Sequence, residues 1–453
     1  MDPVDPRDAR IAELEGLLSQ ALEQIRVLSQ RVAQLEGRSG GGKGAPPTSS
    51  SAGAKRDPTG RKPGGQPGHK GHRRELLTPT TTTECIPKAC RGCGKALRAG
   101  RDADPLRHQV IDIPPMQPTV AEFRLHRLTC SCGVTTCGQL PPGTPTGMMG
   151  PRLLALVGLL VAGCHVSRRK VRSLLHDVLG VDVSLGALSE SEEVISNAVA
   201  APVDEARLAA VAAKVKHADG TTWYRENAFR ALWVLATTGV TVFGIFESAT
   251  KEVLERWMGR RGTLVSDRGS QLVFWDMHRR QICWAHLIRK FAWYAEQGGE
   301  PARFGLALLE RARVLMREWH RVRDGSITRE TFRRNTAATR ASVEVMLGAG
   351  ARLPIIGGSC QHILEHRDAL WRFASHEGVE PTNNHAEQEL RSFVLWRKTT
   401  LGSQSARGDA FAANLKSVIQ TCRKQKRHVL GYLSDAIRAS FSRQSAPSLL
   451  HAP

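Results

Sequence analysis

The chain has 453 residues, enough for two or three domains with cores of their own, and 64 Lys and Arg against 43 Asp and Glu give it a net charge of +21. Its longest apolar run, residues 153–163, is too short to span a bilayer, and its first ten residues lack the basic-then-apolar order of a signal peptide. These features argue against a membrane or secreted protein, and the charge predicts a polyanionic partner, because neutralising phosphates releases counterions.

A heptad pattern runs from Ile11 to Leu35 and predicts a coiled-coil helix within residues 1–36. Apolar residues recur at alternating steps of three and four: Ile11, Leu14, Leu18, Ala21, Ile25, Leu28, Val32 and Leu35. This seam predicts pairing with a second copy, as a homodimer or higher oligomer. A single amphipathic helix packed on its own domain is the alternative.

Residues 37–75 are rich in Gly, Ser, Pro and basic side chains and nearly lack large apolar residues, which predicts a basic disordered linker. Its second half, residues 64–74, is a glycine-rich basic arm that can follow a phosphate backbone or a minor groove. A solvated linker without DNA contact is the alternative. We predict that DNA is bound by Lys62, just before this arm, and by four residues within it: His69, Lys70, Arg73 and Arg74.

Paired cysteines predict a small Zn²⁺-binding domain at residues 76–145. Cys90 and Cys93 flank two residues, and Cys130 and Cys132 flank one. Four thiolates can hold a tetrahedral structural zinc ion that leaves no position open for catalysis. The spacing of the second pair is unusual, so Cys85 or Cys137 can substitute as a ligand, and free thiols are the alternative to zinc.

Residues 150–213 have a helical pattern, with Ser184 as the expected N-cap of one helix. Basic residues at the helix turns allow a DNA-binding helix-turn-helix. A segment that only braces the next domain is the favoured alternative.

Three runs with strand character follow, residues 215–221, 229–238 and 240–246, and predict a three-stranded meander whose first strand ends at Asp219. After a helix at residues 249–258, a further run ends at Asp267. Residues 281–290 are then expected to form a strand that leads into a helix. Cys283 and His286 lie one helical turn apart there, and they either pack in the core or share a metal ion. An all-helical insertion is expected at about residues 300–375.

A third acid, Glu387, is expected in the first turn of a later helix. Three carboxylates supplied by strand ends and a helix suit divalent cations, which prefer oxygen ligands. Each acid also has a structural explanation of its own. Asp219 can belong to a hairpin turn, Asp267 can cap a turn, and Glu387 can pair with Asn384 in a capping box. Glu389, two residues on, should point elsewhere on the helix.

The segment from residue 396 to 453 is basic again, and its densest run is residues 423–427. Such a run is often only a solvated helix face, but its position after Glu387 favours DNA contact. The DNA-binding residues predicted in and just before this segment are Arg391, Arg397 and Lys398. Arg391 is four residues after Glu387 and should share its helix face.

With these motifs in order, the chain resembles the transposases of the insertion sequence 66 family. The matching features are the N-terminal helix, the arm at 64–74, the cysteine pairs, and the motifs at 219–221, 266–269, 283–286 and 381–387. The resemblance implies an α/β fold: a ribonuclease-H-like catalytic domain at residues 214–395, interrupted by the helical insertion and preceded by the coiled coil, the linker and the zinc-binding domain. It assigns Asp219, Asp267 and Glu387 as the catalytic triad.

The expected activity is Mg²⁺- or Mn²⁺-dependent strand cleavage and strand transfer at the ends of an insertion sequence. The expected partners are double-stranded DNA, as element ends and as target, a second copy of the chain, and accessory proteins of the same element. We therefore expect a cytoplasmic, nucleoid-associated enzyme. A nuclease that cuts without joining and a DNA-binding regulator without catalysis are the alternatives.

Overall fold

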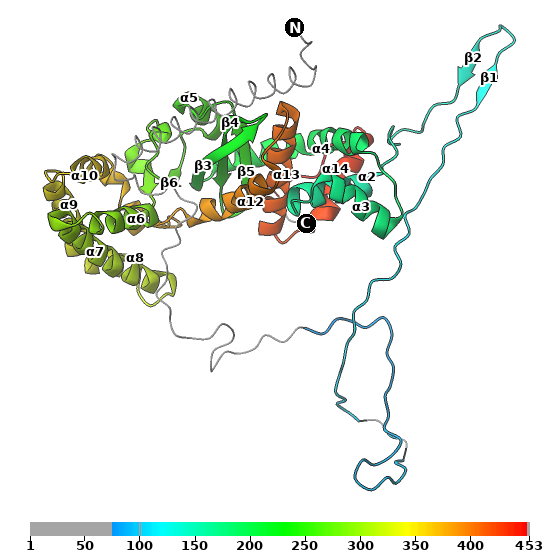
Figure 1. Ribbon diagram of the computed structural model, residues 1–453, viewed down its shortest axis with the longest axis horizontal. Helices are drawn as coiled ribbons and strands as arrows, with labels where there is room; N and C mark the ends of the chain where they lie inside the picture. The colour runs from blue at the N-terminus through cyan, green and yellow to red at the C-terminus, as the bar shows by residue number, and fades with distance from the viewer. Residues whose placement is uncertain (1–74, 99, 101, 451–453) are drawn as a thin grey trace, which may run out of the picture. The chain divides into compact units, whose positions relative to one another are not determined.

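The computed structural model describes residues 75–98, 100 and 102–450, which belong to two compact units that meet in the sequence at Pro105 (Figure 1). The predicted coiled coil and the linker up to residue 74 lie outside the described residues. In the first unit, Ala89 and Ala96 form an isolated bridge, and the amide of Leu97 donates to the carbonyl of Lys88 at 3.0 Å. The first cysteine pair therefore lies in a tight turn.

The second unit begins with a small hairpin of β1 (Arg127–Thr129) and β2 (Thr135–Cys137). The hairpin turn contains the second cysteine pair, and the amide of Cys130 donates to the carbonyl of Val134 at 2.9 Å. Both strands are exposed on every residue, so this hairpin has no hydrophobic core of its own.

A five-stranded mixed sheet lies at the centre of the second unit, in the order β5-β4-β3-β6-β7. Neighbours among β3, β4 and β5 pair antiparallel, whereas β6 pairs parallel to both β3 and β7. The strands are β3 (Val215–Arg225), β4 (Ala228–Ala236), β5 (Thr241–Phe246), β6 (Thr263–Ser266) and β7 (Arg280–Ile282). The predicted meander is confirmed.

The prediction that the first strand ends at Asp219 is wrong, because β3 continues to Arg225 and Asp219 pairs with Val234 on β4. The ring of Trp233 explains the glycine after the acid, because a Cβ on Gly220 would lie 2.5 Å from that ring. The hairpin turn comes at residues 226–227, both with positive φ as a two-residue type I′ turn requires.

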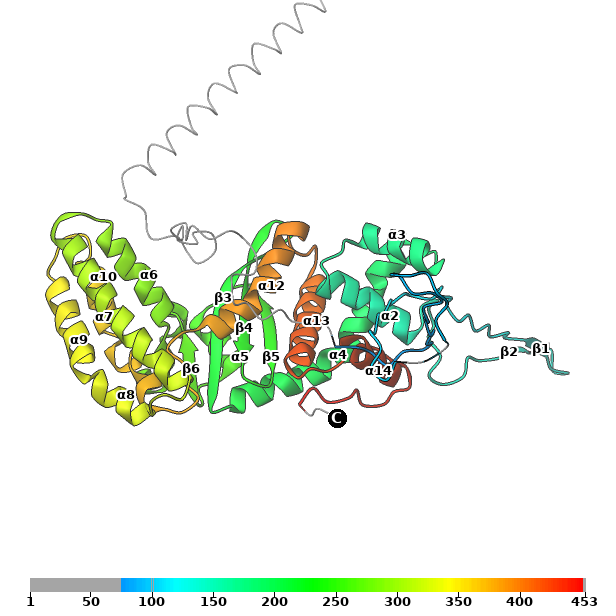
Figure 2. The same ribbon diagram turned by 90° about the horizontal axis from the view of Figure 1, so that it is seen from below.

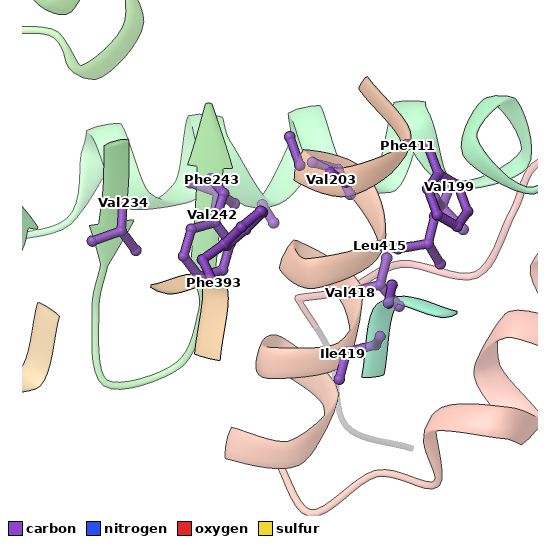
Figure 3. Close-up of a cluster of buried hydrophobic side chains, with 14 of the residues drawn as sticks. Val199, Val203, Val234, Val242, Phe243, Phe393, Phe411, Leu415, Val418 and Ile419 are labelled. Atoms are coloured by element: carbon purple, nitrogen blue, oxygen red, sulfur yellow. The ribbon is translucent and has the colours of Figure 1, made fainter. Parts of the chain in front are cut away.

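Helical elements from both ends of the second unit share one hydrophobic core with β3, β4 and β5. They are α2 (Pro151–Gly158), the π-helical turn η1 (Leu159–Gly163), α3 (Arg168–Leu179), α4 (Leu185–Ala212), α12 (Asn384–Thr400), α13 (Ala406–Lys424) and α14 (Val429–Phe441). The predicted Ser184 cap is confirmed, since its side chain accepts from the amide of Ala187. Figure 3 shows Val199 of α4, Phe243 of β5 and Leu415 of α13 among the buried side chains that join these elements.

The edge strand β5 is covered by α13. The hydroxyl of Thr421 accepts from the amide of Thr241 at 3.0 Å, and that of Ser417 accepts from the amide of Phe243 at 2.9 Å. The helix thereby satisfies donors that would otherwise form an open sheet edge.

The connection from β5 to β7 contains α5 (Lys251–Met258), η2 (Ser270–Leu272) and η3 (Met277–Arg279). The insertion that follows is all-helical, as predicted, and lies at the β6–β7 side of the sheet in Figures 1 and 2. Its elements are α6 (Trp284–Ala295), α7 (Gly299–Arg323), α8 (Arg329–Asn335), α9 (Ala337–Gly350), α10 (Gly357–Leu364), η4 (Arg367–Ala369) and α11 (Arg372–Ser375).

The insertion has a second hydrophobic core, which includes Leu308, Trp319 and Phe373 and reaches β6 through Val265. Thr336 lies between α8 and α9, and its hydroxyl donates to the carbonyl of Phe332 at 2.7 Å. Within the described part of the chain, no helix is both long and apolar enough to cross a membrane.

Candidate active site

Asp219 and Asp267 come from two neighbouring parallel strands. The last pair in the register of β3 and β6 is His217 with Val265, and each aspartate follows its member of that pair by two residues. Because side chains alternate along a strand, this spacing favours one level and one face for both carboxylates. Both residues line a groove of about 390 Å³. The structure therefore brings two of the three predicted acids together.

Backbone amides hold both carboxylates. Oδ1 of Asp219 accepts from the amide of Gly220, and Oδ1 of Asp267 accepts from the amide of Gly269, each at 2.9 Å. The second bond is the turn-capping contact that the sequence offered as an alternative role for Asp267. The buried guanidinium of Arg280 donates to the backbone carbonyl of Asp267 at 2.7 Å and fixes the same turn.

Glu387 enters the site from α12, whose start is held by the fully buried side chain of Asn383. Nδ2 of Asn383 donates to the carbonyl of Ala218 at 2.8 Å, and its Oδ1 lies 3.2 Å from Nδ1 of His217. The start of α12 is thus bonded to β3 immediately before Asp219. The prediction that Glu387 lies in the first helical turn is confirmed.

The structural alternatives that the sequence offered for Asp219 and Glu387 are both wrong. Asp219 is not in a hairpin turn, as the course of β3 shows. The capping box is also wrong, because the N-cap of α12 is Asn383 and no side chain caps this helix. Asn384 is exposed.

Glu389 points away from this site, as predicted. Its carboxylate lies 3.1 Å from Nζ of Lys424, which is also 2.9 Å from Nε2 of His385. The ring of His385 in turn lies 5.1 Å from that of His217. The far side of α12 is therefore tied to α13 and β3 by a polar chain that does not include Glu387.

Three side chains at the start of α6 surround Glu387. Its Oε1 lies 4.0 Å from Sγ of Cys283, 3.5 Å from Nδ1 of His286 and 3.9 Å from Nη2 of Arg289. The amide of Trp284 donates to the carbonyl of Pro381 at 2.8 Å, so α6 and the segment before α12 are joined at this point. The sequence placed Cys283 and His286 one turn apart but gave them no acidic partner.

Burial and mutual repulsion set the charges at the site. Burial and, after it, the negative charges of Asp267 and Glu387 together raise the pKa of Asp219 to about 7, against the opposing hydrogen bond from Gly220. Burial raises the pKa of the Cys283 thiol to about 11. Burial, followed by the charge of Arg289, lowers the pKa of His286. The three predicted acids therefore share one electrostatic environment.

Residues 146–410, more than half of the chain, match the sequence profile of the family described as Transposase IS66 family. The chain belongs to this family. No curated protein matches it. The match extends from the helices before β3 to the early part of α13, so it includes the sheet, the helical insertion and all three acids of this IS66-family chain. It confirms the resemblance inferred from the ordered motifs.

The predicted zinc ligands lie in two units, each of which is described by itself. In the first, hydrogen bonds from the backbone of Cys93 and Gly92 lower the pKa of Cys90. In the second, hydrogen bonding to the backbone of Cys132 lowers the pKa of Cys130. Turns that direct amides at sulfur stabilise thiolates, the form that binds zinc. A zinc ion shared by the two pairs stays a prediction.

The predicted DNA-binding residues fall into three groups. Lys62, His69, Lys70, Arg73 and Arg74 lie outside the described residues. Arg391 and Lys398 are exposed on α12. Arg397 is instead bonded to β3, where its Nη1 donates to Oγ1 of Thr222 at 2.6 Å. Its side chain is therefore part of the contact between α12 and the sheet.

Sequence reasoning missed the roles of Asn383 and Arg289. Asn383 stood in a motif that was recognised, but its bonds to β3 depend on a contact between positions more than 160 residues apart. Arg289 lies six residues after Cys283, and its approach to Glu387 likewise requires the fold. An asparagine directly before the acidic first turn of a helix is the sequence signal that could have indicated Asn383.

Proposed function

We propose that this IS66-family chain cleaves DNA at the ends of an insertion sequence and joins the freed ends to target DNA, using divalent metal ions. The observation that carries the proposal is the convergence of Asp219, Asp267 and Glu387, from β3, β6 and α12, on one electrostatic environment beside a groove. The strand order, with three antiparallel strands followed by two parallel ones, supports the ribonuclease-H-like architecture that the family resemblance implies.

The donor set fits Mg²⁺ or Mn²⁺. All three acids offer carboxylate oxygens, which these ions prefer, and the pKa of Asp219 is raised first by burial and then by the neighbouring negative charges, both of which a bound cation would offset. Asp219, Asp267 and Glu387 would hold these ions. When bound, such ions supply Lewis-acid stabilisation of the attacking and leaving oxygens of an in-line displacement at phosphorus.

The chain's own groups then orient the DNA. Thr221, Thr222 and Arg230 line the groove beside the two aspartates and offer hydrogen-bond donors to a phosphate. Arg289, whose side chain is 44% exposed, lies beside Glu387 and offers its guanidinium to the phosphate backbone of a bound DNA strand. Cleavage and joining need the same in-line geometry and differ only in the nucleophile, a water or a DNA 3′-hydroxyl, so one site serves both.

Two element ends must be brought together before joining. We infer that the N-terminal heptads pair two copies of the chain and that the basic arm and cysteine pairs contact the ends. Accessory proteins of the same element and association with the nucleoid belong to this proposal. Chains that stay monomeric and still join paired ends would contradict the role given to the heptads.

The test is cleavage and joining of labelled element-end DNA in Mg²⁺ or Mn²⁺, with DNA binding measured in parallel. Asp267→Ala should bind DNA like the wild type and give no products, whereas Asp276→Ala, which alters an exposed carboxylate nine residues further on, should retain activity. Cleavage without joining by the wild type would identify a nuclease. Binding without any product in Mg²⁺ or Mn²⁺ would favour a regulator.

A further inference from the structure

A second kind of metal-ligand set overlaps the acidic site. Cys283, His286 and Glu387 each offer one ligand atom, and these three atoms lie within 4.8 Å of one another. Two of the three donors are sulfur and nitrogen, which Mg²⁺ does not choose and which Zn²⁺ binds well. The set draws on two elements, since Cys283 caps the start of α6 and Glu387 lies in the first turn of α12.

The spacing is close to that of a tetrahedral zinc ion. Zinc bond lengths of about 2.0–2.3 Å place neighbouring ligand atoms about 3.4–3.6 Å apart. In the structure, Oε1 of Glu387 is 3.5 Å from Nδ1 of His286 and 4.0 Å from Sγ of Cys283. The remaining pair, Sγ of Cys283 and a ring nitrogen of His286, lies within 4.8 Å, so closing all three ligand atoms around one ion needs movements of up to about 1 Å. The side chains of His286 and Glu387 are about one-quarter exposed, at 24% and 26%, which leaves a fourth position for water or a phosphate oxygen.

The surroundings of the ligands suit a metal. Sγ of Cys283 accepts from the amide of Asn383 at 3.1 Å, the kind of bond that orients a thiolate ligand. Nδ1 of His286 is buried and has no hydrogen-bond partner among the residues that the structure describes. An uncommitted ring nitrogen directed at a carboxylate 3.5 Å away is available as a ligand. The positive charge of Arg289, 3.9 Å from Glu387, disfavours a cation at this site. The Arg289 side chain is 44% exposed, however, and can turn toward solvent.

We propose that Cys283, His286 and Glu387 form a Zn²⁺ site, separate from the cysteine pairs of the N-terminal half, that competes with the oxygen-ligand site for Glu387. Binding displaces the thiol proton of Cys283 to solvent and leaves three protein ligands on the ion. With Glu387 turned toward α6, the carboxylates of Asp219 and Asp267 lose their third partner. The inhibition that follows rests on the catalytic role proposed for Glu387, whereas zinc binding itself does not.

Zinc binding is tested with the full chain under reducing conditions. Bound Zn²⁺ per chain is measured after equilibrium dialysis, and Co²⁺ is used as a spectroscopic substitute for its thiolate charge-transfer band. Cys283→Ala and His286→Ala should each bind one ion fewer than the wild type. Cys360→Ala, which removes another fully buried cysteine in the helical insertion, should bind the wild-type number. His286→Ala keeps the test valid if Cys283→Ala does not fold. Equal stoichiometry in all four proteins would overturn the proposal.

Competition is tested by adding Zn²⁺ to the joining reaction at fixed Mg²⁺. Each variant is compared with its own rate without Zn²⁺, and the Zn²⁺ concentration for half inhibition should rise at least about tenfold in Cys283→Ala but not in Cys360→Ala. If no protein joins DNA while the stoichiometries still differ, the proposed function fails and the zinc site stands. Inhibition that is equal in the wild type and Cys283→Ala would refute the competition for Glu387.

Discussion

Asn383 is the residue through which the structure positions the third acid, and removing its side chain should destabilise the fold measurably. In Asn383→Ala, the carbonyl of Ala218 and Nδ1 of His217 both lose their partner inside the protein. Each buried polar group left unpaired costs about 1–3 kcal/mol, so for these two groups we expect a loss of about 2–6 kcal/mol in the free energy of unfolding. Burial lowers the pKa of His217 to about 4, so the ring is neutral and its unpaired nitrogen is not rescued by protonation near neutral pH.

Urea unfolding followed by tryptophan fluorescence measures this loss, because all nine tryptophans lie between Trp223 and Trp396 and report on the second unit alone. Asn384→Ala is the matched control, an exposed asparagine one position later whose loss should cost less than about 0.5 kcal/mol. If Asn383→Ala unfolds within about 0.5 kcal/mol of the wild type, the bonds to β3 do not hold α12 in place.

Three further predictions concern the pH, the helical insertion and DNA. Without metal, the pKa of Asp219 is raised from 3.8 to about 7, so the folded state holds a proton that the unfolded state releases. Stability in EDTA should therefore fall as the pH rises from about 4 to about 7, by up to about 4 kcal/mol, and Asp219→Asn should flatten this profile. Gly305→Ala would place a methyl 2.3 Å from a backbone nitrogen of α6 and should lower the melting temperature by several degrees, whereas Gly348→Ala, with open space around it, should stabilise by about 0.5–1 kcal/mol. Lys398→Ala should reduce the slope of log affinity for DNA against log salt by about one, whereas Arg397→Ala should lower stability because Arg397 is bonded to β3.

Different results would count against each of these. A stability profile that rises with pH over the same range would contradict the burial of an uncompensated carboxylate at Asp219. Equal melting temperatures for Gly305→Ala and Gly348→Ala would contradict the close approach of α6 and α7. If Lys398→Ala leaves the slope of log affinity for DNA against log salt unchanged, Lys398 does not contact DNA.

Much of the sheet and insertion could be predicted from local pattern. Alternating apolar residues and turn signals identified the meander, and helical periodicity identified the insertion. The extension of β3 past Asp219 could not be predicted, because a glycine directly after an acidic residue, as at Gly220, is typical of a turn. What decides the matter is the ring of Trp233 on the next strand, which only glycine can accommodate.

The candidate site was predictable as a set of acids but not as an arrangement. The order of the motifs indicated Asp219, Asp267 and Glu387. The motifs did not indicate which side chains lie next to each acid. The partners of Glu387 lie about 100 positions earlier in the chain, at Cys283 and His286. Local pattern carries no information on contacts of that separation. For the same reason, the bond from Arg397 to Thr222 of β3 could not be predicted, and contact of Arg397 with DNA stays a prediction.

The most direct test of the central claim is anomalous diffraction from crystals of the chain with element-end DNA, soaked in Mn²⁺. We predict Mn²⁺ within about 2.2 Å of carboxylate oxygens of Asp219, Asp267 and Glu387, beside the scissile phosphate. Mn²⁺ bound elsewhere, with these three carboxylates free of metal in a complex that holds DNA, would contradict the assignment of the catalytic site.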